Sequence, residues 1–368
     1  MKLRKSPVVL ILSLLASGNV YSTEWVKEIA FEGAAKPSLA IGADNQPRIA
    51  FMVEAMPGFV GFAERRDDMW VAQQVASGYF YGPLDLVMRG ASPIINYHDH
   101  DREDQVVAIR DELGWSLNPI NHPGHDGWDN TVAIDSAGRL HTLTTDPLDF
   151  GGPGLEYATL EGGEWRVEEV GTGPIMYAEG LSMTFAGDSA PHISYHNTLE
   201  RSLYYGTRLE GGWQLTRVDS GPNAGMFSSI ALATDGTPHI SYVRFTVAGA
   251  EICLATLQDG QWRSELVDTL PDLTVGFTFA RNATSLRIDP AGFRHVAYSG
   301  ESTINLARKA EAGWEIEIID TIANNLGTRF GQQVDLERDA MGQWHLVTFE
   351  VLNVSPLTGN ILYYRSVP

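Results

Sequence analysis

Cysteine is almost absent from this chain of 368 residues, in which Cys253 is the single example. One cysteine excludes an internal disulfide framework and any Cys-x-x-Cys zinc site. Because Cys253 lies between the apolar residues Ile252 and Leu254, we expect its thiol to behave as a small buried apolar group.

Basic residues are also scarce. The chain has 26 Lys and Arg against 46 Asp and Glu, a formal net charge of −20. Nucleic-acid backbones are neutralised by clustered Lys and Arg, so this balance argues against nucleic acid as a partner, although it permits a small local cationic site. The sequence also lacks the fingerprints of phosphate loops, dinucleotide-binding folds, zinc proteases and Gly-x-Ser-x-Gly hydrolases.

Long apolar runs are missing except near the N-terminus, where Lys2, Arg4 and Lys5 precede the stretch 8–16. That stretch is too short to span a bilayer as a stable anchor, and Ser22 is a suitable small residue before a cleavage site. We therefore predict a secretory signal over 1–22 and a single exported domain over 23–368, periplasmic or secreted and without a membrane span. The alternative is a short uncleaved anchor.

Tryptophan recurs at intervals of 45 to 52 residues, commonly after a Gly-containing turn and before an alternating segment that is typical of a half-buried strand. The tryptophans in this frame are Trp25, Trp70, Trp115, Trp165, Trp213, Trp262 and Trp314. We interpret them as packing residues between sheets.

A second landmark recurs in the same register, an Asp/Gly turn followed by a histidine. The histidines at this position are His141, His192, His239, His295 and His345. Because one occurs in each of several repeats, we interpret them as packing or hydrogen-bonding residues rather than as ligands.

Each repeat therefore contains four short antiparallel strands, which is the signature of a propeller blade. The sequence predicts an all-β, seven-bladed propeller. The segment 23–30 supplies a spare fourth strand and the last repeat, from about 331 to 368, lacks one, so we expect the N-terminal strand to pair into the last blade and close the ring. Two open domains are the alternative.

The turns Leu257–Trp262 and Leu209–Trp213 are shortened relatives of the Asp-box, Ser-x-Asp-x-Gly-x-x-Trp. On these turns the chain resembles the secreted bacterial propellers of the sialidase-like, BNR-repeat superfamily. It departs from true sialidases, which have six blades and an Arg-Ile-Pro motif that Pro47-Arg48-Ile49 does not match. Seven-bladed relatives include polysaccharide lyases that act on uronate-containing polymers, so the resemblance implies carbohydrate recognition by analogy of fold.

One face of such a propeller would carry the short hairpin turns, and the other would carry long irregular loops, where function concentrates. Two irregular loops are rich in histidine and form a candidate divalent metal site in which imidazoles suit zinc and carboxylates suit calcium. Its candidate ligands are His98, His100, His122, His125 and Asp126. The alternative is a solvated acidic loop, and we predict no other cofactor.

A uronate lyase needs a base, an acid for the leaving oxygen and a cation for the substrate carboxylate. His196 or His122 is the candidate base, and Tyr195, Tyr242 or Tyr298 is the candidate acid. The candidate substrate-binding residues are Arg244, Arg281, Arg329, Tyr298 and Trp128, because guanidinium groups pair bidentately with carboxylates. A glycoside hydrolase would need two flanking carboxylates and is less favoured.

The leading interpretation is a secreted propeller that recognises an extracellular polysaccharide and cleaves it by β-elimination if it is an enzyme. The alternative is a non-catalytic scaffold that binds protein partners in the periplasm or at the cell surface. An enzyme predicts that a histidine, a tyrosine and an arginine converge within reach of one sugar unit.

Overall fold

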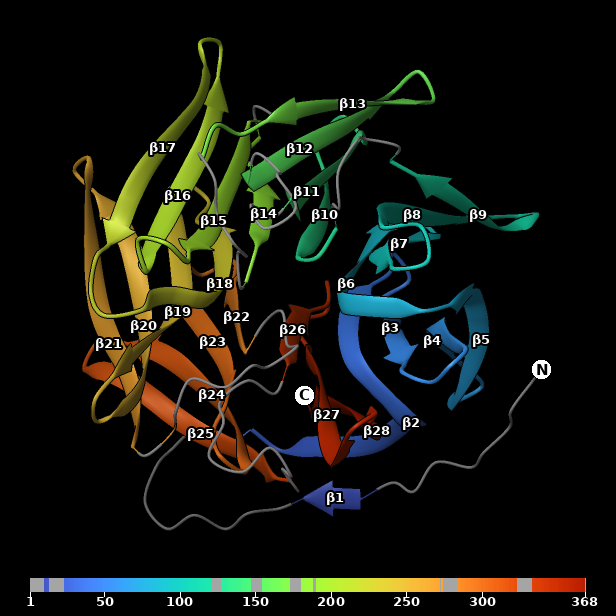
Figure 1. The fold of residues 1–368 in the computed structure, drawn as a ribbon. Coiled ribbons are helices and arrows are strands. Elements are labelled where there is room, and N and C mark those ends of the chain that lie inside the picture. Colours follow the sequence, from blue (N-terminus) through green and yellow to red (C-terminus); the bar gives the residue numbers. More distant parts are fainter. Residues whose placement is uncertain are drawn as a thin grey trace.

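The computed structural model describes residues 10–12, 23–120, 127–146, 154–172, 180–187, 190–271, 273, 283–322 and 333–367. These residues form strands and turns, and no helix occurs among them (Figure 1). The all-β prediction is confirmed. Accordingly, no helix of the described residues is available to cross a membrane.

Five sheets contain four consecutive antiparallel strands each. They are β6 (Phe80–Arg89) to β9 (Gly114–Pro119), β10 (Asn130–Ile134) to β13 (Glu164–Glu169), β14 (Ser182–Phe185) to β17 (Gly212–Asp219), β18 (Ala224–Leu232) to β21 (Gln261–Pro271), and β22 (Thr284–Ile288) to β25 (Gly313–Thr321). The strands between these ends are β7 (Ser92–Asp99), β8 (Asp104–Asp111), β11 (Leu140–Asp146), β12 (Gly154–Glu161), β15 (Pro191–Asn197), β16 (Ser202–Leu209), β19 (Pro238–Thr246), β20 (Gly249–Gln258), β23 (Arg294–Ser299) and β24 (Thr303–Ala310).

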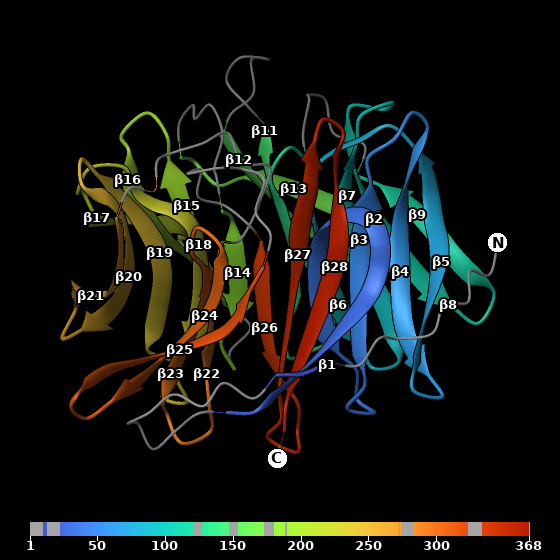
Figure 2. The same ribbon diagram turned by 90° about the horizontal axis from the view of Figure 1, so that it is seen from below.

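The remaining sheet joins the two ends of the chain through one long strand, β2 (Trp25–Ile41). The first part of β2 pairs with β28 (Leu357–Ser366), and its second part pairs with β3 (Pro47–Val53). The other members are β1 (Leu10–Leu12), β4 (Gly58–Arg66), β5 (Met69–Gly78), β26 (Val334–Arg338) and β27 (Trp344–Val354). Figure 2 shows β2 lying between the red β28 and the blue β3.

We number the four-strand sets along the chain as units. The first unit is the second part of β2 with β3 to β5, the second to sixth units are the five separate sheets, and the last unit is β26 to β28 with the first part of β2. In each unit the first strand lies towards the middle of the molecule and the Trp-led strand lies at the outside (Figure 1).

The N-terminal strand is longer than the sequence indicates. The alternating pattern predicts a strand over 23–30, whereas β2 continues to Ile41 and serves two units. Its register shifts beside Gly33 and Lys36, which both have positive φ, and these irregularities let a single strand pass from an outer position to an inner one. Residues 10–12 pair with β2 as β1, and the secretory signal over 1–22 stays a prediction.

The Asp/Gly turns form for a local reason that is clearest between β10 and β11. The Asp135 carboxylate accepts hydrogen bonds from the backbone N–H groups of Ala137 and Arg139, both at 2.9 Å. Gly138 adopts φ +78°, a conformation that favours glycine. The same Asp-to-backbone pattern recurs at Asp289 and Asp339.

The hydrophobic core consists of separate clusters, each of which joins two consecutive units. One cluster joins the last unit to the first and includes Phe349 and Tyr363 from the last unit and Phe51 from the first. Another holds Trp25, which is only 2% exposed, against strands of the sixth and last units. Burial of apolar surface therefore stabilises each junction between units, including the one between the ends of the chain.

Candidate functional site

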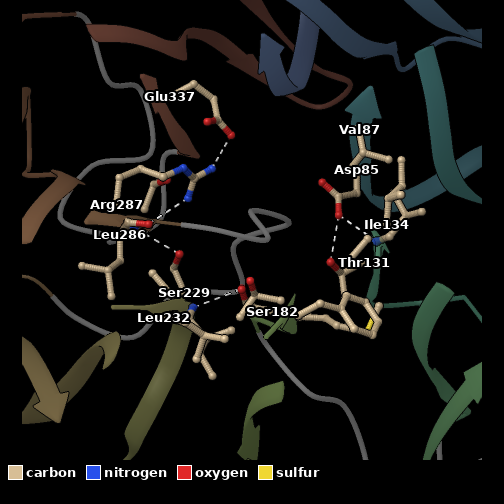
Figure 3. Close-up of a pocket in the computed structure, with 18 of the residues that line it drawn as sticks. Asp85, Val87, Thr131, Ile134, Ser182, Ser229, Leu232, Leu286, Arg287 and Glu337 are labelled. Carbon is tan, nitrogen blue, oxygen red and sulfur yellow. Dashed lines mark hydrogen bonds and ion pairs between the residues drawn. The ribbon is translucent and has the colours of Figure 1, made fainter. Parts of the chain in front are cut away.

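A central channel of about 630 Å³ lies in the middle of the described structure. It is lined by the first strand of every unit, from Leu39 on β2 through Asp85 on β6 to Glu337 on β26. In Figure 3, Arg287 and Glu337 lie across the channel from Asp85.

A belt of polar side chains runs around this channel and links consecutive units at every junction except that between the third and fourth units, where no such bond is seen among the described residues. A hydroxyl or carboxylate on one first strand accepts a hydrogen bond from a backbone N–H on the first strand of the following unit. The pairs are Ser38 with Leu86 N (3.1 Å), Asp85 with Val132 N (2.8 Å), Ser182 with Ile230 N (3.1 Å), Ser229 with Leu286 N (3.1 Å), Ser285 with Leu336 N (3.1 Å) and Asp335 with Leu39 N (3.0 Å). The last pair links the last unit to the first. The sequence does carry a signal for this belt, which was missed: a Ser or Asp recurs on the first strand of every unit except the third, which has Thr131 there.

The charges in the channel are mainly acidic. Arg287 pairs with Glu337 at 2.5 Å and approaches Asp335 at 3.5 Å. Burial raises the pKa of Asp335 to about 6, against the opposing pull of Arg287. With Asp85 on the opposite wall, the described lining has more negative than positive side chains, so it disfavours an anionic polymer.

The repeated histidines connect the Asp/Gly turn to the third strand of the same unit. His141 Nε2 lies 3.3 Å from Asp135, and His141 Nδ1 lies 2.7 Å from the Tyr157 hydroxyl. Similar contacts join His192 to Tyr205 and His345 to Tyr363, each at 2.6 Å. Burial lowers the pKa of His141, which favours its neutral form. These contacts agree with the hydrogen-bonding role predicted for this position.

The tryptophan frame also joins neighbouring units. The Trp70 indole N–H donates to Glu28 at 2.9 Å, and the Trp213 indole N–H donates to Glu168 at 3.0 Å. In both pairs the glutamate lies three residues after the tryptophan of the preceding unit, Trp25 or Trp165. The recurring Trp-x-x-Glu spacing therefore has a physical cause in the contact between units.

A second hollow, which we call the arginine cleft, has a volume of about 190 Å³ and lies between the third and fourth units. It is lined by Arg139, His141, Tyr157, Thr159, Glu161, Arg166, Val167, Glu168, Pro191 and Arg208. Because Arg139 follows the β10–β11 turn and Glu161 and Arg166 flank the β12–β13 turn, the cleft opens on the hairpin face. Sequence reasoning favoured the opposite, irregular face.

The three guanidinium groups of the cleft are held by carboxylates yet stay open to solvent. Arg139 binds Asp135 at 2.7 Å, Arg166 binds Glu161 at 2.9 Å and Arg208 binds Glu168 at 2.9 Å. The exposed fractions of the three arginine side chains are 47%, 76% and 46%. Hydrogen bonding to Glu168 raises the pKa of Arg208. The cleft thus offers cationic donors on a chain whose net charge is −20.

The predicted base and acid in the fourth unit lie inside the protein. Tyr195 is 1% exposed and stacks on Tyr204, with 5.4 Å between ring centroids. His196 is 4% exposed, and neither of its ring nitrogens has a hydrogen-bond partner among the described residues. Burial lowers the pKa of His196 to about 4. Neither residue lines the channel or the arginine cleft.

The predicted residues of the fifth and sixth units are tied to acidic partners. The Tyr242 hydroxyl donates to Asp219 at 2.5 Å, and the Tyr298 hydroxyl donates to Asp268 at 2.6 Å. Arg244 pairs with Asp219 and with Glu251, at 3.2 and 2.7 Å. Tyr242 and Arg244 therefore meet through their shared partner Asp219. The predicted base His196 lies on β15 of the fourth unit, whereas Tyr242 and Arg244 lie on β19 of the fifth. Arg281 and Arg329 lie outside the described residues, and the catalytic and substrate-binding roles stay predictions.

The predicted metal ligands that the structure describes do converge. The ligand atoms of His98, His100 and Glu103 all lie within 4.8 Å of one another, and Trp128 stacks on His98 with 5.5 Å between ring centroids. His98 and His100 were predicted as metal ligands and Trp128 as a substrate-binding residue, whereas Glu103 was not assigned a role from the sequence. The other predicted ligands, His122, His125 and Asp126, lie outside the described residues.

Comparison with known proteins gives no family model and no curated protein that matches the chain. Among solved structures, an inactive virginiamycin B lyase from Staphylococcus aureus, crystallised with quinupristin, is 10% identical with a TM-score of 0.58, and the likeness covers 99% of this chain and 100% of that one. An arginine-to-alanine triple mutant of AofleA from Arthrobotrys oligospora is 14% identical with a TM-score of 0.53, covering 78% and 87% of the two chains.

The SapL1 lectin in complex with alpha methyl fucoside is 13% identical with a TM-score of 0.51, covering 78% of this chain and 96% of that one. At these identities the likeness bears on the fold alone. The resemblance to the sialidase-like, BNR-repeat superfamily finds no matching family model, but the β-propeller fold that it implied is supported.

Proposed function

We propose that the chain is a seven-bladed propeller whose function is to bind carbohydrate outside the cytoplasm. The ring closure is supported by β2, which pairs with both β28 and β3, by the hydrogen bond from Leu39 N to Asp335 and by the hydrophobic cluster between the last and first units. Each numbered unit then corresponds to one blade.

The observation that carries the binding function is the arginine cleft. Arg139, Arg166 and Arg208 present partly exposed guanidinium groups next to Glu161 and Glu168. Guanidinium groups bind carboxylates in a bidentate manner, and glutamates accept hydrogen bonds from hydroxyl groups. A cleft of about 190 Å³ is small compared with sites for drug-sized ligands, so it suits a single sugar unit. We therefore infer an acidic sugar as the ligand.

Lectins among the structural neighbours support the carbohydrate class, since one was solved with alpha methyl fucoside. The arginines favour a sugar acid over a neutral sugar. The test is calorimetric titration of the chain over 23–368 with oligogalacturonate and oligoglucuronate, using neutral galactose and fucose oligosaccharides as comparators.

Arg166→Gln is the informative variant because the side chain is largely exposed and its loss leaves the core intact. Loss of one charged hydrogen bond, worth about 1.5–3 kcal/mol, lowers affinity for the acidic oligosaccharide about 10-fold or more. Arg263→Gln is the matched control, since Arg263 also follows a frame tryptophan, Trp262, and is exposed but does not line the cleft. Equal affinities for the two variants, or tighter binding of the neutral sugars, would contradict the proposal.

A second candidate function is β-elimination in the same cleft. It is favoured by the His141 and Tyr157 pair, because this cleft joins a histidine, a tyrosine and arginines at one place. Both side chains are largely buried, at 3% and 5% exposed, so the substrate would have to displace their mutual hydrogen bond. His141 would then take the proton beside the uronate carboxylate, the electron pair would form the ring double bond as the glycosidic carbon–oxygen bond breaks, and Tyr157 would protonate the leaving oxygen. Burial raises the pKa of Tyr157 to about 12, so the phenol keeps its proton at neutral pH.

Packing alone also accounts for this pair, because His192 and Tyr205 make the same contact in the next unit. Ultraviolet absorbance of the unsaturated product distinguishes the two functions. A lyase loses product formation in Tyr157→Phe but keeps it in Tyr205→Phe, which removes the equivalent hydrogen bond away from the arginines. Binding of the acidic oligosaccharide without any rise in absorbance would support the binding function and exclude the lyase function.

The proposed location follows from the predicted signal over 1–22. Expression of the full chain in a Gram-negative host should yield an exported protein whose N-terminus is Thr23, as determined by mass spectrometry. A chain retained at full length in the membrane fraction would support the uncleaved anchor. Capture of a specific protein partner, with no glycan bound, would support the scaffold alternative.

A further inference from the structure

Three metal-ligating side chains meet where β7 ends and the chain turns back into β8. His98 and His100 are two residues apart, and alternate residues of an extended segment share one side. The turn between the strands is closed by a hydrogen bond from Arg102 N to the Asp99 carbonyl at 3.2 Å, and Glu103 adopts φ +53°. This turn brings the Glu103 carboxylate back over the two histidines.

The rings of both histidines are held by aromatic neighbours. His98 is 0% exposed and stacks on Trp128, with 26° between the ring planes. Gly127 lies against the Nδ1 atom of His98, since a Cβ added at Gly127 would be 3.0 Å from that nitrogen. His100 makes an edge contact with Tyr79, with ring centroids 4.7 Å apart. This packing leaves His98 Nε2 directed towards Glu103.

The spacing of the ligand atoms is close to what a small divalent ion requires. Bonds of about 2.0–2.1 Å in a tetrahedral site place neighbouring ligand atoms roughly 3.3 Å apart. His100 Nδ1 lies 3.4 Å from Glu103 Oε1, and His98 Nε2 lies 4.0 Å from the other carboxylate oxygen, Glu103 Oε2. All three ligand atoms lie within 4.8 Å of one another, and the Glu103 side chain, which is 36% exposed, has room to adjust.

We propose that His98, His100 and Glu103 form a binding site for a first-row divalent metal ion such as Zn²⁺. Two imidazole nitrogens and one carboxylate suit this class of ion, whereas Ca²⁺ prefers a shell of oxygen ligands. These three ligands come from the described residues, and a tetrahedral ion takes a fourth, for which water, an oxygen of a ligand or one of the predicted ligands His122, His125 and Asp126 is a candidate. The site is separate from the arginine cleft, and its test does not depend on carbohydrate binding.

The experiment is calorimetric titration of the metal-free chain, prepared without a histidine tag, with Zn²⁺ alone. We expect one ion bound per chain and a melting temperature raised by saturating Zn²⁺, because a ligand that binds only the native state stabilises it. Glu103→Gln and His100→Gln each remove a ligand from a partly exposed position, and each should lower the affinity at least ~10-fold.

Glu112→Gln is the matched control, since Glu112 is an exposed acid in the β8–β9 turn of the same unit and the substitution changes the net charge equally. Its Zn²⁺ affinity should equal that of the unaltered chain. Absence of saturable binding at one ion per chain overturns the proposal, and so does a Glu103→Gln affinity equal to that of Glu112→Gln. Circular dichroism of each variant confirms that it is folded before titration.

Discussion

Removal of the Trp25 side chain tests the junction between the two ends of the chain. The indole is 2% exposed and belongs to the hydrophobic cluster that includes Ile304, Leu346 and Leu362 of the sixth and last units. An aromatic side chain buries about 150–250 Å², which at about 25 cal/mol per Å² amounts to roughly 4–6 kcal/mol as an upper bound. Measured Trp→Ala substitutions in cores cost about 3–5 kcal/mol. We therefore expect Trp25→Ala to lower the free energy of unfolding by about 4 kcal/mol.

The assay is urea unfolding combined with hydrogen exchange measured by mass spectrometry. Because Trp25 is in register with Ser366 of β28, the peptide that covers Leu357–Ser366 should exchange faster in the variant. Trp165→Ala is the comparison, since Trp165 is only partly buried at the edge of its cluster and should cost less. A cost below about 1 kcal/mol for Trp25→Ala, with unchanged exchange in β28, would refute the docking of the N-terminal strand and with it the closed ring.

Two further predictions concern stability. The buried His196 has a pKa lowered to about 4, whereas the unfolded chain binds that proton near pH 6.5. The free energy of unfolding should therefore be constant above about pH 6.5 and fall by up to about 3 kcal/mol as the pH drops towards 4. The urea midpoint should change less with pH in His196→Gln than in the unaltered chain. Parallel pH profiles for the two proteins would contradict this. Ser285→Ala leaves the buried Leu336 N–H unpaired and should cost about 1–3 kcal/mol in the same assay, whereas a cost under about 0.5 kcal/mol would show that the belt contributes little.

Local patterns predicted much of the architecture. Alternation after each frame tryptophan indicated a half-buried strand, and β17 and β21 each begin one residue before their tryptophan, Trp213 or Trp262. The Asp/Gly turns appeared where Asp135 and Asp289 precede a glycine, because a carboxylate that caps its own backbone turn needs only nearby residues.

The candidate site was less predictable. Tyr195, Tyr242 and Arg244 were grouped from the sequence by residue type, yet their polar groups are buried or already paired. The arginine cleft contains Arg139 and Arg208, which lie 69 positions apart in the sequence and come from different units. No local pattern reports that two such residues border the same hollow.

The amino-acid sequence by itself determined the strand period, the turns and the repeat of about one unit per tryptophan, because those depend on residues a few positions apart. Only the tertiary structure decided which side chains of neighbouring units meet, as in the polar belt, the arginine cleft and the bend that lets β2 serve two units. The physical reason is that these contacts depend on the packing and rotation of whole sheets against one another, and a one-dimensional pattern carries no record of that geometry.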